Sequence, residues 1–230
     1  MDYVKRLEKL MTRLRGPRGC PWDRRQTHQS LKPYLLEEAH EVLDAIDEGN
    51  PDSLREELGD LLLQVVFHSQ LAKEKGAFNF QQVAKTIGDK LVRRHPHVFG
   101  KGASRKIADI NRKWEELKRL EKPERKSALD GLPKSLPALL RAQRMHEKIS
   151  KQGGVEDRVR FEKKLGKSWN RLQRVLARGA APQKKKALGE FLMLLVRAAQ
   201  TRGIHAEMAL AAASARFEKN YRKREAPRQK

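Results

Sequence analysis

A nearly continuous apolar run, LLLQVVF over residues 61–67, constrains the fold more than any other part of the chain. The surrounding pattern is helical, and a helix that is apolar on most sides is normally buried among other helices. Four polar side chains nevertheless line up along this helix at helical spacing, namely Glu57, Asp60, Gln64 and His68. Because buried carboxylates need partners, this line predicts a polar site inside an all-α bundle with no sheet.

Another acidic helix is expected just before this one in the chain, at about residues 35–48. Its apolar positions recur at helical spacing, with two more leucines beside them: Leu35, Ala39, Val42 and Ile46, then Leu36 and Leu43. Its acids, Glu37, Glu38 and Glu41, fall on the other side. The sequence Gly49-Asn50-Pro51 ends this helix, and Ser53 with Glu56 has the form of a capping box for the next one. We therefore expect an antiparallel helix pair.

Each helix of the pair offers two carboxylates three residues apart, Glu38 and Glu41 on one and Glu57 and Asp60 on the other. Facing carboxylates repel one another unless some take up protons or a cation lies between them. Ligation by oxygen alone suits Mg²⁺, with Mn²⁺ as a substitute, better than Zn²⁺. Taken alone, Glu38 and Glu41 would be read as part of a solvated helix face. Together with the acidic line at Glu57 and Asp60 they predict a metal site.

Composition and charge limit the classes of protein to be considered. The chain has 230 residues, is 38% hydrophobic and contains one cysteine, Cys20. No apolar run reaches membrane-spanning length and the N-terminus lacks a signal-peptide core, so we expect a cytoplasmic protein without disulfides. The net charge is +22, yet residues 1–100 hold 16 of the 51 Lys/Arg and 15 of the 29 Asp/Glu. The excess of positive charge therefore lies after residue 100, where it would attract polyanions.

Other segments of the first half frame the acidic helices. Residues 2–15 predict an amphipathic helix, and a proline-containing loop follows in which Trp22 could line a pocket or simply anchor the turn. A further helix is expected from Asn79 to about Arg94, with Lys90 and Arg94 four residues apart. Two cations so spaced can hold a polyphosphate, or they can be ordinary surface residues. A fourth segment, residues 107–117, has helical spacing and is expected to pack across the bundle.

Three runs of sequence resemble one known family: CPWDRRQTHQSLKPYLLEEAHEVLDAI, REELGDLLLQVVFHSQLA and DKLVRRHPHVFG. They are similar to the MazG-type nucleoside triphosphate pyrophosphohydrolases, whose hallmark is EExxE followed at a distance by ExxD. The likeness implies an all-α, usually dimeric enzyme that splits NTPs or dNTPs into monophosphate and pyrophosphate with Mg²⁺. By the same likeness Glu38, Glu41, Glu57 and Asp60 would be metal ligands, with Glu37 beside them.

The resemblance also implies roles for other residues. Lys90 and Arg94 match positions that look like triphosphate-binding residues in the family, and Trp22 is a candidate substrate contact. A water molecule would attack the α-phosphorus in line with departing pyrophosphate. Glu37 or Glu38 is our choice for the carboxylate that accepts the proton of that water.

Longer members of the family carry two copies of the helical module, and this chain resembles such a tandem. We expect a catalytic module at residues 1–120, a linker and connecting helix at 121–150, and a degenerate second repeat at 151–230. Aligning Gly189-Glu190 on Gly59-Asp60 places Arg171 and Arg174 opposite Glu38 and Glu41. Only Glu190 survives as an acid, so the second repeat is expected to be catalytically inactive. Its helices are expected near residues 156–178, 184–202 and 205–224, with a disordered tail after Arg222.

The basic second repeat allows two interpretations. It could be structural, completing a core or dimer interface within a soluble basic shell, which we favour. It could instead bind a polyanion through residues 158–179 and the tail. Two functions from different classes follow for the whole chain: an Mg²⁺-dependent NTP pyrophosphohydrolase acting through the first repeat, or a non-enzymatic nucleotide or nucleic-acid binding protein derived from one. Retention of all the hallmark acids in the first repeat favours the enzyme.

Overall fold

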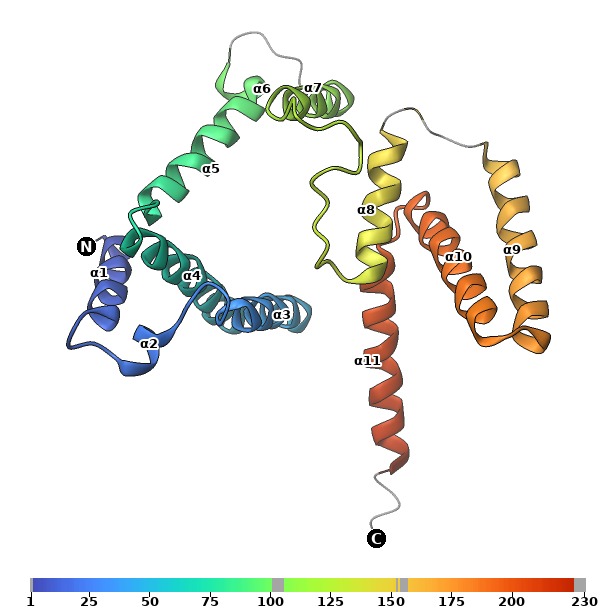
Figure 1. Cartoon of the computed structure of the whole chain (residues 1–230), viewed down its shortest axis with the longest axis horizontal. Coiled ribbons are helices and arrows are strands. Elements are labelled where there is room, and N and C mark those ends of the chain that lie inside the picture. Colours follow the sequence, from blue (N-terminus) through green and yellow to red (C-terminus); the bar gives the residue numbers. More distant parts are fainter. Residues whose placement is uncertain (1, 101–105, 152, 154–156, 226–230) are drawn as a thin grey trace. The chain divides into compact units, whose positions relative to one another are not determined.

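The computed structural model describes residues 2–100, 106–151, 153 and 157–225, and all of its regular elements in those ranges are helices (Figure 1). They are α1 (Tyr3–Arg15), α2 (Pro21–Arg25), α3 (Lys32–Glu48), α4 (Pro51–Glu74), α5 (Phe80–Arg94), α6 (Pro96–Phe99), α7 (Ile107–Leu120), α8 (Ala138–Ser150), α9 (Arg158–Arg178), α10 (Ala181–Gln200) and α11 (Ala206–Glu225). The predicted all-α fold is confirmed, since no strand occurs in the described ranges.

The chain divides into two compact units, residues 1–117 and residues 118–230. The first unit contains the acidic helices α3 and α4, which pack extensively against each other. The segment expected to be a linker and connecting helix contributes α8 to the second unit, where α8 packs on α10 and α11. None of the described helices combines the length and the apolar character needed to cross a bilayer.

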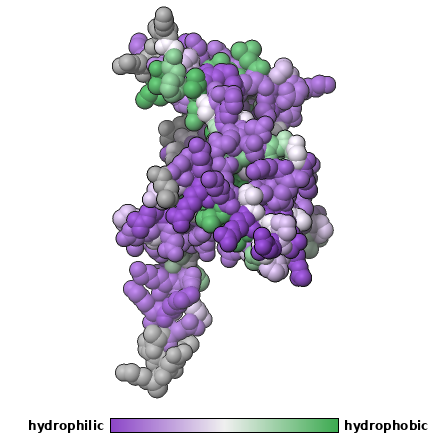
Figure 2. Space-filling model, turned by 90° about the vertical axis from the view of Figure 1, so that its left-hand side faces the viewer, coloured by the Kyte–Doolittle hydropathy of each residue, from purple (hydrophilic) through white to green (hydrophobic). Residues whose placement is uncertain are grey.

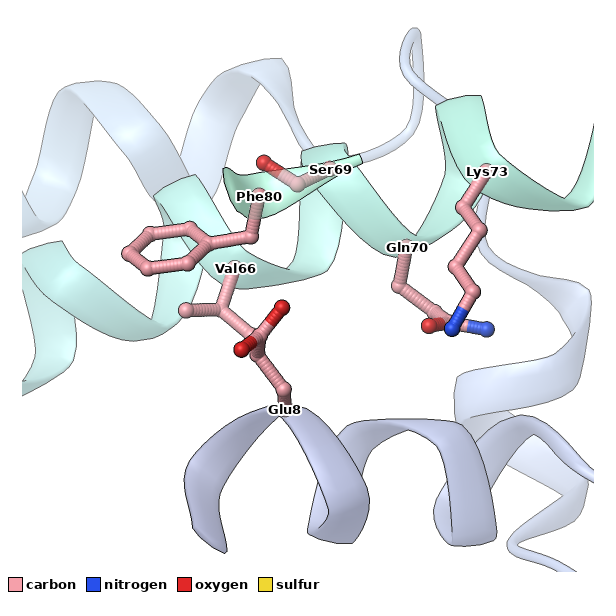
Figure 3. Close-up of a pocket in the computed structure, with 6 residues that line it drawn as sticks. All are labelled: Glu8, Val66, Ser69, Gln70, Lys73 and Phe80. Carbon is pink, nitrogen blue, oxygen red and sulfur yellow. The ribbon is translucent and has the colours of Figure 1, made fainter. Parts of the chain in front are cut away.

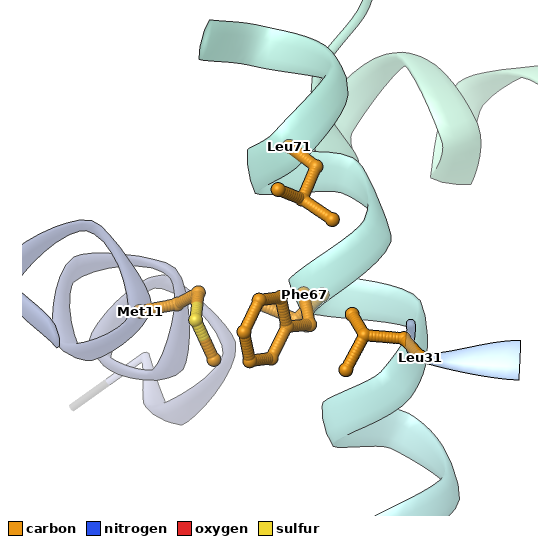
Figure 4. Close-up of a cluster of buried hydrophobic side chains, with 5 residues drawn as sticks. Met11, Leu31, Phe67 and Leu71 are labelled. Carbon is orange, nitrogen blue, oxygen red and sulfur yellow. The ribbon is translucent and has the colours of Figure 1, made fainter. Parts of the chain in front are cut away.

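The core of the first unit forms where α1 crosses α4 (Figure 4). Met11 of α1 and Leu31, just before α3, enclose Phe67 of α4, whose side chain is 3% exposed. Val66 and Leu71 complete the cluster. Each large apolar side chain that is buried contributes about 1.5–3 kcal/mol of stabilisation, so this crossing stabilises the first unit.

A charged contact fastens α1 to the far end of α4. Arg15 donates two hydrogen bonds to Glu74, from Nε to Oε1 at 2.8 Å and from Nη2 to Oε2 at 2.6 Å. The same guanidinium donates to the backbone carbonyl of Asp23 and lies 5.5 Å from the centre of the Phe67 ring. Bidentate pairs of this kind fix geometry as well as adding energy, so Arg15 ties α1, the loop and α4 together.

A two-residue turn joins α3 to α4. Gly49 adopts a left-handed conformation with φ of 71°, and its N–H donates to the carbonyls of Ala45 and Ile46. The expected capping box at Ser53 is wrong: Asn50 is the N-cap, its side chain accepts from the backbone of Asp52 at 3.0 Å, and α4 starts at Pro51. Asn50 is the N-cap rather than Ser53 because proline is favoured at the first position of a helix, where its missing N–H costs no hydrogen bond. The helix therefore starts at Pro51, and the residue before it, asparagine, is a strongly preferred N-cap.

Much of the apolar surface expected in a bundle core is open. On α3 Leu36 is 60% exposed and Ile46 54%, and on α4 Leu58, Leu62 and Val65 are exposed as well. The expectation that α4 is buried on most sides is therefore wrong for the single chain. Figure 2 shows one side of the molecule, where apolar patches interrupt a mainly hydrophilic surface.

The expectation that the fourth segment packs across the bundle is wrong as well. In α7, Ile107 is exposed, and Trp114 instead contacts the end of α5. The apolar spacing of the segment correctly indicated a helix but not its neighbours, because spacing carries no information about which surface lies opposite.

The second unit has the helices expected from the repeat, at Arg158–Arg178, Ala181–Gln200 and Ala206–Glu225. The pair α9–α10 packs as closely as α3–α4 does, around the buried side chains of Phe161, Leu172 and Val196. The expected disordered tail after Arg222 is corrected in part, because α11 continues to Glu225. Residues 226–230 of that tail lie outside the described part of the chain.

Candidate active site

The antiparallel pair α3–α4 brings three carboxylates together. Each of Glu38, Glu41 and Glu57 offers an oxygen, and these oxygens lie within 4.8 Å of one another. Glu38 and Glu57 are half-buried and Glu41 is exposed, so the group lies at the rim of the helix interface. Such a group of carboxylate oxygens is a donor set that suits a hard divalent cation.

The carboxylates of this group repel one another. Burial, followed by the charge of Asp60, raises the pKa of Glu38 above its ordinary value. Burial, followed by the charges of Glu41 and Asp60, raises the pKa of Glu57. Both carboxyls thus hold protons more tightly than in water, which is the condition that a bound cation would relieve.

Gln64 extends the acidic group along α4. Its side chain is 6% exposed, and Nε2 donates a long hydrogen bond of 3.4 Å to Oε1 of Glu38. This bond lowers the pKa of Glu38, against the larger effect of burial. The Oε1 atom of Gln64 is buried without a hydrogen-bond partner. An orphaned buried oxygen beside a carboxylate group fits a site that takes a further polar or cationic occupant.

Two other acids of the predicted site lie beside the group of three. Asp60 comes one turn after Glu57 and is close enough to raise the pKa of both Glu38 and Glu57. Glu37 is exposed on α3, next to Glu38 in sequence. The structure therefore brings Glu38, Glu41 and Glu57 into the tightest contact, with Asp60 at its edge.

The predicted cationic residues belong to a different part of the first unit. Lys90 and Arg94 are on α5, which starts at the C-terminal end of α4 and leads away from the α3–α4 pair (Figure 1). Arg94 lies over the ring of Trp114, 5.4 Å from its centre. In the single chain, the structure does not bring these two cations together with the carboxylates.

Trp22 lies in α2 and contacts the start of α3. Its ring is 50% exposed and meets Tyr34 edge to face, with 5.8 Å between ring centres. Its backbone carbonyl accepts from the side chain of Gln26 at 3.1 Å, and the hydroxyl of Ser30 donates to Gln26 at 2.7 Å. These contacts anchor the turn, while the Trp22 side chain stays half exposed.

A histidine pair continues the polar line of α4 and was not foreseen. The Nδ1 atoms of His28 and His68 are 2.8 Å apart, the ring centres are 5.1 Å apart and the ring planes differ by 6°. These values describe coplanar rings meeting edge to edge through one N–H···N bond rather than rings stacked face to face. Burial, followed by the charge of His28, lowers the pKa of His68. Sequence periodicity marked His68, but His28 lies in a loop without any periodic signal.

The corresponding position in the second unit is occupied differently. Arg171 on α9 and Glu190 on α10, which align with Glu38 and Asp60, form an ion pair of 2.7 Å. Ala187 is buried where Glu57 stands in the first unit. A single carboxylate already paired with an arginine cannot take the place of the three-carboxylate group.

A small pocket with a volume of about 20 Å³ lies between α1, α4 and α5 in the first unit (Figure 3). It is lined by Glu8, Val66, Ser69, Gln70, Lys73 and Phe80, and its lining contains none of the clustered carboxylates. The pocket is therefore separate from the candidate active site.

Fold and site together define a class: an all-helical protein in which an antiparallel helix pair carries a carboxylate cluster. Residues 26–99, from the loop before α3 to the end of α6, match the MazG nucleotide pyrophosphohydrolase domain. The chain is 41% identical over 230 residues to the nucleoside triphosphate pyrophosphohydrolase of Escherichia coli K12, covering 96% of this chain and 87% of that protein.

Two further relatives carry similar names. The nucleoside triphosphate pyrophosphohydrolase/pyrophosphatase MazG of Thermotoga maritima is 40% identical over 228 residues, which cover 95% of this chain and 84% of that one. The nucleoside triphosphate pyrophosphohydrolase of Mycobacterium tuberculosis is 43% identical over 155 residues, covering 66% and 45% respectively. The chain therefore belongs to the MazG family of nucleoside triphosphate pyrophosphohydrolases.

Proposed function

We propose that this chain hydrolyses nucleoside triphosphates, NTPs or dNTPs, to the monophosphate and pyrophosphate through its first unit. The observation that carries the proposal is the group formed by Glu38, Glu41 and Glu57, whose oxygens lie within 4.8 Å of one another. Family membership and the names of relatives aligned over almost the whole chain support the same activity.

The donor set fits Mg²⁺, with Mn²⁺ as the natural substitute. Glu38, Glu41 and Glu57 would hold the cation, and Asp60 would complete the set from the edge of the group. The raised pKa values of Glu38 and Glu57 and the unpartnered oxygen of Gln64 support this fit. When bound, such a cation neutralises charge on the phosphate oxygens and orients the substrate.

The residues of the chain then supply the remaining chemistry. A water oxygen attacks the α-phosphorus, the bond from that phosphorus to the bridging oxygen breaks, and pyrophosphate leaves. Glu38 or the adjacent Glu37 accepts the proton that the water loses.

Lys90, Arg94 and Trp22 are proposed to contact the substrate, the two cations at its phosphates. In a single chain α5 leads away from the carboxylates, so we further propose that the working unit is a homodimer. The open apolar side chains of α3 and α4, such as Leu36 and Leu62, support such an assembly, because an unpartnered apolar surface on a thin helical layer is typical of an interface.

A second candidate function is binding without hydrolysis. The positive charge after residue 100 supports binding of polyanions by the second unit, alongside or instead of the enzymatic activity of the first.

A product assay separates these functions. The purified chain is incubated with each of the eight common NTPs and dNTPs and Mg²⁺, and monophosphate, pyrophosphate and inorganic phosphate are measured separately. Equal release of monophosphate and pyrophosphate that stops on adding EDTA is the expected result. Binding of nucleotide without product, or release of inorganic phosphate as the primary product, would overturn the enzymatic proposal.

A further inference from the structure

We propose that one exposed face of α9 binds the phosphodiester backbone of a nucleic acid without reading its sequence. This inference deepens the polyanion binding proposed for the second unit and does not depend on hydrolysis by the first. It rests on a row of basic side chains that we call the cationic face, made up of Arg160, Lys164, Lys167, Arg171, Arg174 and Arg178.

The spacing of the cationic face places all its members on one side of the helix. Successive residues are four, three, four, three and four positions apart, which is the repeat of an α-helix. At 1.5 Å per residue the row is about 27 Å long. All six side chains are exposed. The sequence alone shows eight basic residues in α9, and the helix assigned by the structure aligns six of them into this row.

Half of the charges on this face have no ion-pair partner among the described residues. Glu162 is the one acid of α9, and it pairs with Arg202, outside the cationic face, at 3.3 Å; Arg160 and Lys164 also have partners. Arg171 pairs with Glu190. Lys167, Arg174 and Arg178 make no ion pair with any described residue. Like charges at this spacing repel one another, and bound phosphates would relieve that repulsion.

The helix is held in place by its other side, so the row is presented on a fixed surface. Phe161 and Leu172 are 4% and 2% exposed and pack α9 against α10. Arg197 of α10 lies 4.6 Å from the centre of the Phe161 ring. The N-terminus is capped by Asp157, whose side chain accepts from the backbone of Arg160 at 3.0 Å. Little ordering is then needed when a ligand binds.

The form of the face selects among anions. Its charges are spread along a rod, so a compact anion such as one triphosphate can engage only a few of them, whereas a nucleic acid offers phosphates at regular intervals. Of the exposed apolar residues of α9, Trp169 and Leu176 lie on the opposite side of the helix from Lys167 and Arg174, and the small Val159 lies about 100° from Arg160 at the start of the helix. The face therefore lacks the apolar wedge that anchors a helix in a membrane surface. It also lacks aromatic side chains for stacking on bases, which predicts contact with the backbone alone.

The test measures binding of labelled duplex DNA, duplex RNA and single-stranded RNA of equal length and mixed sequence to the full chain by fluorescence anisotropy across a salt series. The variant is Lys167→Glu/Arg174→Glu/Arg178→Glu. The control carries the same change of charge on α11, as Arg216→Glu/Lys219→Glu/Lys223→Glu. Thermal unfolding and pyrophosphate release, measured on the same samples, report folding and the first unit separately.

We expect the α9 variant to bind at least about tenfold more weakly, with a slope of log Kd against log salt reduced by about three, while the control changes little. The three nucleic acids distinguish the natural source of the phosphates. Equal loss in both variants would overturn the proposal in favour of diffuse charge. Unchanged binding in the α9 variant, or preferential binding of vesicles rich in anionic lipid over all three nucleic acids, would also overturn it.

Discussion

Arg171 of α9 and Glu190 of α10 form an ion pair of 2.7 Å, at positions that the proposed repeat pairs with Glu38 and Asp60. The two helix pairs share an arrangement but have opposite charge: α3 carries acids where α9 carries arginines and lysines. The side chains of this pair are 55% and 42% exposed, so it contributes little to stability. If the second unit is the degenerate repeat that we propose, it has kept the helix pair while its surface has become one that repels cations.

The first prediction concerns this pair. Glu190→Gln should leave pyrophosphate release unchanged, because the second unit takes no part in hydrolysis. It should lower the free energy of unfolding by no more than about 1 kcal/mol, since the ion pair is exposed. Pyrophosphate release and urea unfolding measure the two effects. A large loss of activity in a variant that folds normally would contradict the assignment of catalysis to the first unit.

The second prediction concerns the carboxylate group. Glu41→Ala or Glu57→Gln should lower pyrophosphate release by at least about 100-fold, because each removes one oxygen donor from the proposed cation site. The matched control is Asp47→Ala, which removes another exposed acid from α3 outside the group. Full activity in either site variant would show that these carboxylates are not ligands.

The third prediction follows from the raised pKa values of Glu38 and Glu57. In EDTA the folded chain binds protons at these sites more tightly than the unfolded chain, so stability should fall as pH rises from the ordinary carboxyl pKa of 4.5 through the raised pKa values of Glu38 and Glu57. Added Mg²⁺ should stabilise the protein most at the upper end, where the carboxylates are ionised. Thermal unfolding with and without Mg²⁺ measures both trends.

A double variant, Glu38→Gln/Glu57→Gln, is the control for that experiment. This variant should lose both the fall in stability as pH rises and the stabilisation by Mg²⁺. If Mg²⁺ raised the unfolding temperature of this variant as much as that of the original chain, the stabilisation would come from another site.

The fourth prediction concerns the contact between Arg15 and Glu74. The hydrogen bonds from Arg15 lower the pKa of Glu74, so its stabilisation is present above the ordinary carboxyl pKa and is lost as pH falls through the lowered value. Glu74→Gln should cost about 1–2 kcal/mol at neutral pH, allowing for its partial exposure. Asp89→Asn, which breaks the exposed pair with Lys85, should cost much less. Equal losses in urea unfolding would contradict this ranking.

The fifth prediction concerns the open apolar side chains of α3 and α4. Leu36→Glu/Leu62→Glu should shift the chain from dimer to monomer, measured by light scattering coupled to gel filtration, because charges would be buried at the interface. Leu210→Glu, at an exposed apolar position on α11, is the control. A monomer for the original chain would contradict the proposed assembly.

Helical spacing in the sequence was sufficient to predict the longer helices of the first unit and the grouping of its acids, but not the short helices α2 and α6. The start of α5 was predicted at Asn79, where a capping box with Gln82 has both of its hydrogen bonds, at 2.9 and 3.0 Å. Glu38, Glu41 and Glu57 meet because i, i+3 spacing and a tight turn leave few other arrangements. These features depend only on residues close together in the chain.

Contacts between distant residues were not predicted. Arg15 looked like an ordinary residue at a helix end, yet it binds Glu74, 59 positions away. His28 and His68 are separated by 40 positions. Spacing also indicates which face of a helix is apolar without indicating what covers it, so Leu36 and Ile46 were expected in a core but are exposed. Such outcomes are set by tertiary packing, which periodicity does not encode.

The turn at Gly49 and Asn50 has a kinetic consequence. With only these two residues between α3 and α4, the carboxylates can meet as soon as the helical hairpin closes, and closing a short loop takes well under about 1 μs. The contact between Arg15 and Glu74 must wait for a far longer loop to close. We therefore expect the proposed ligands to come together before the core at Met11 and Phe67 has formed.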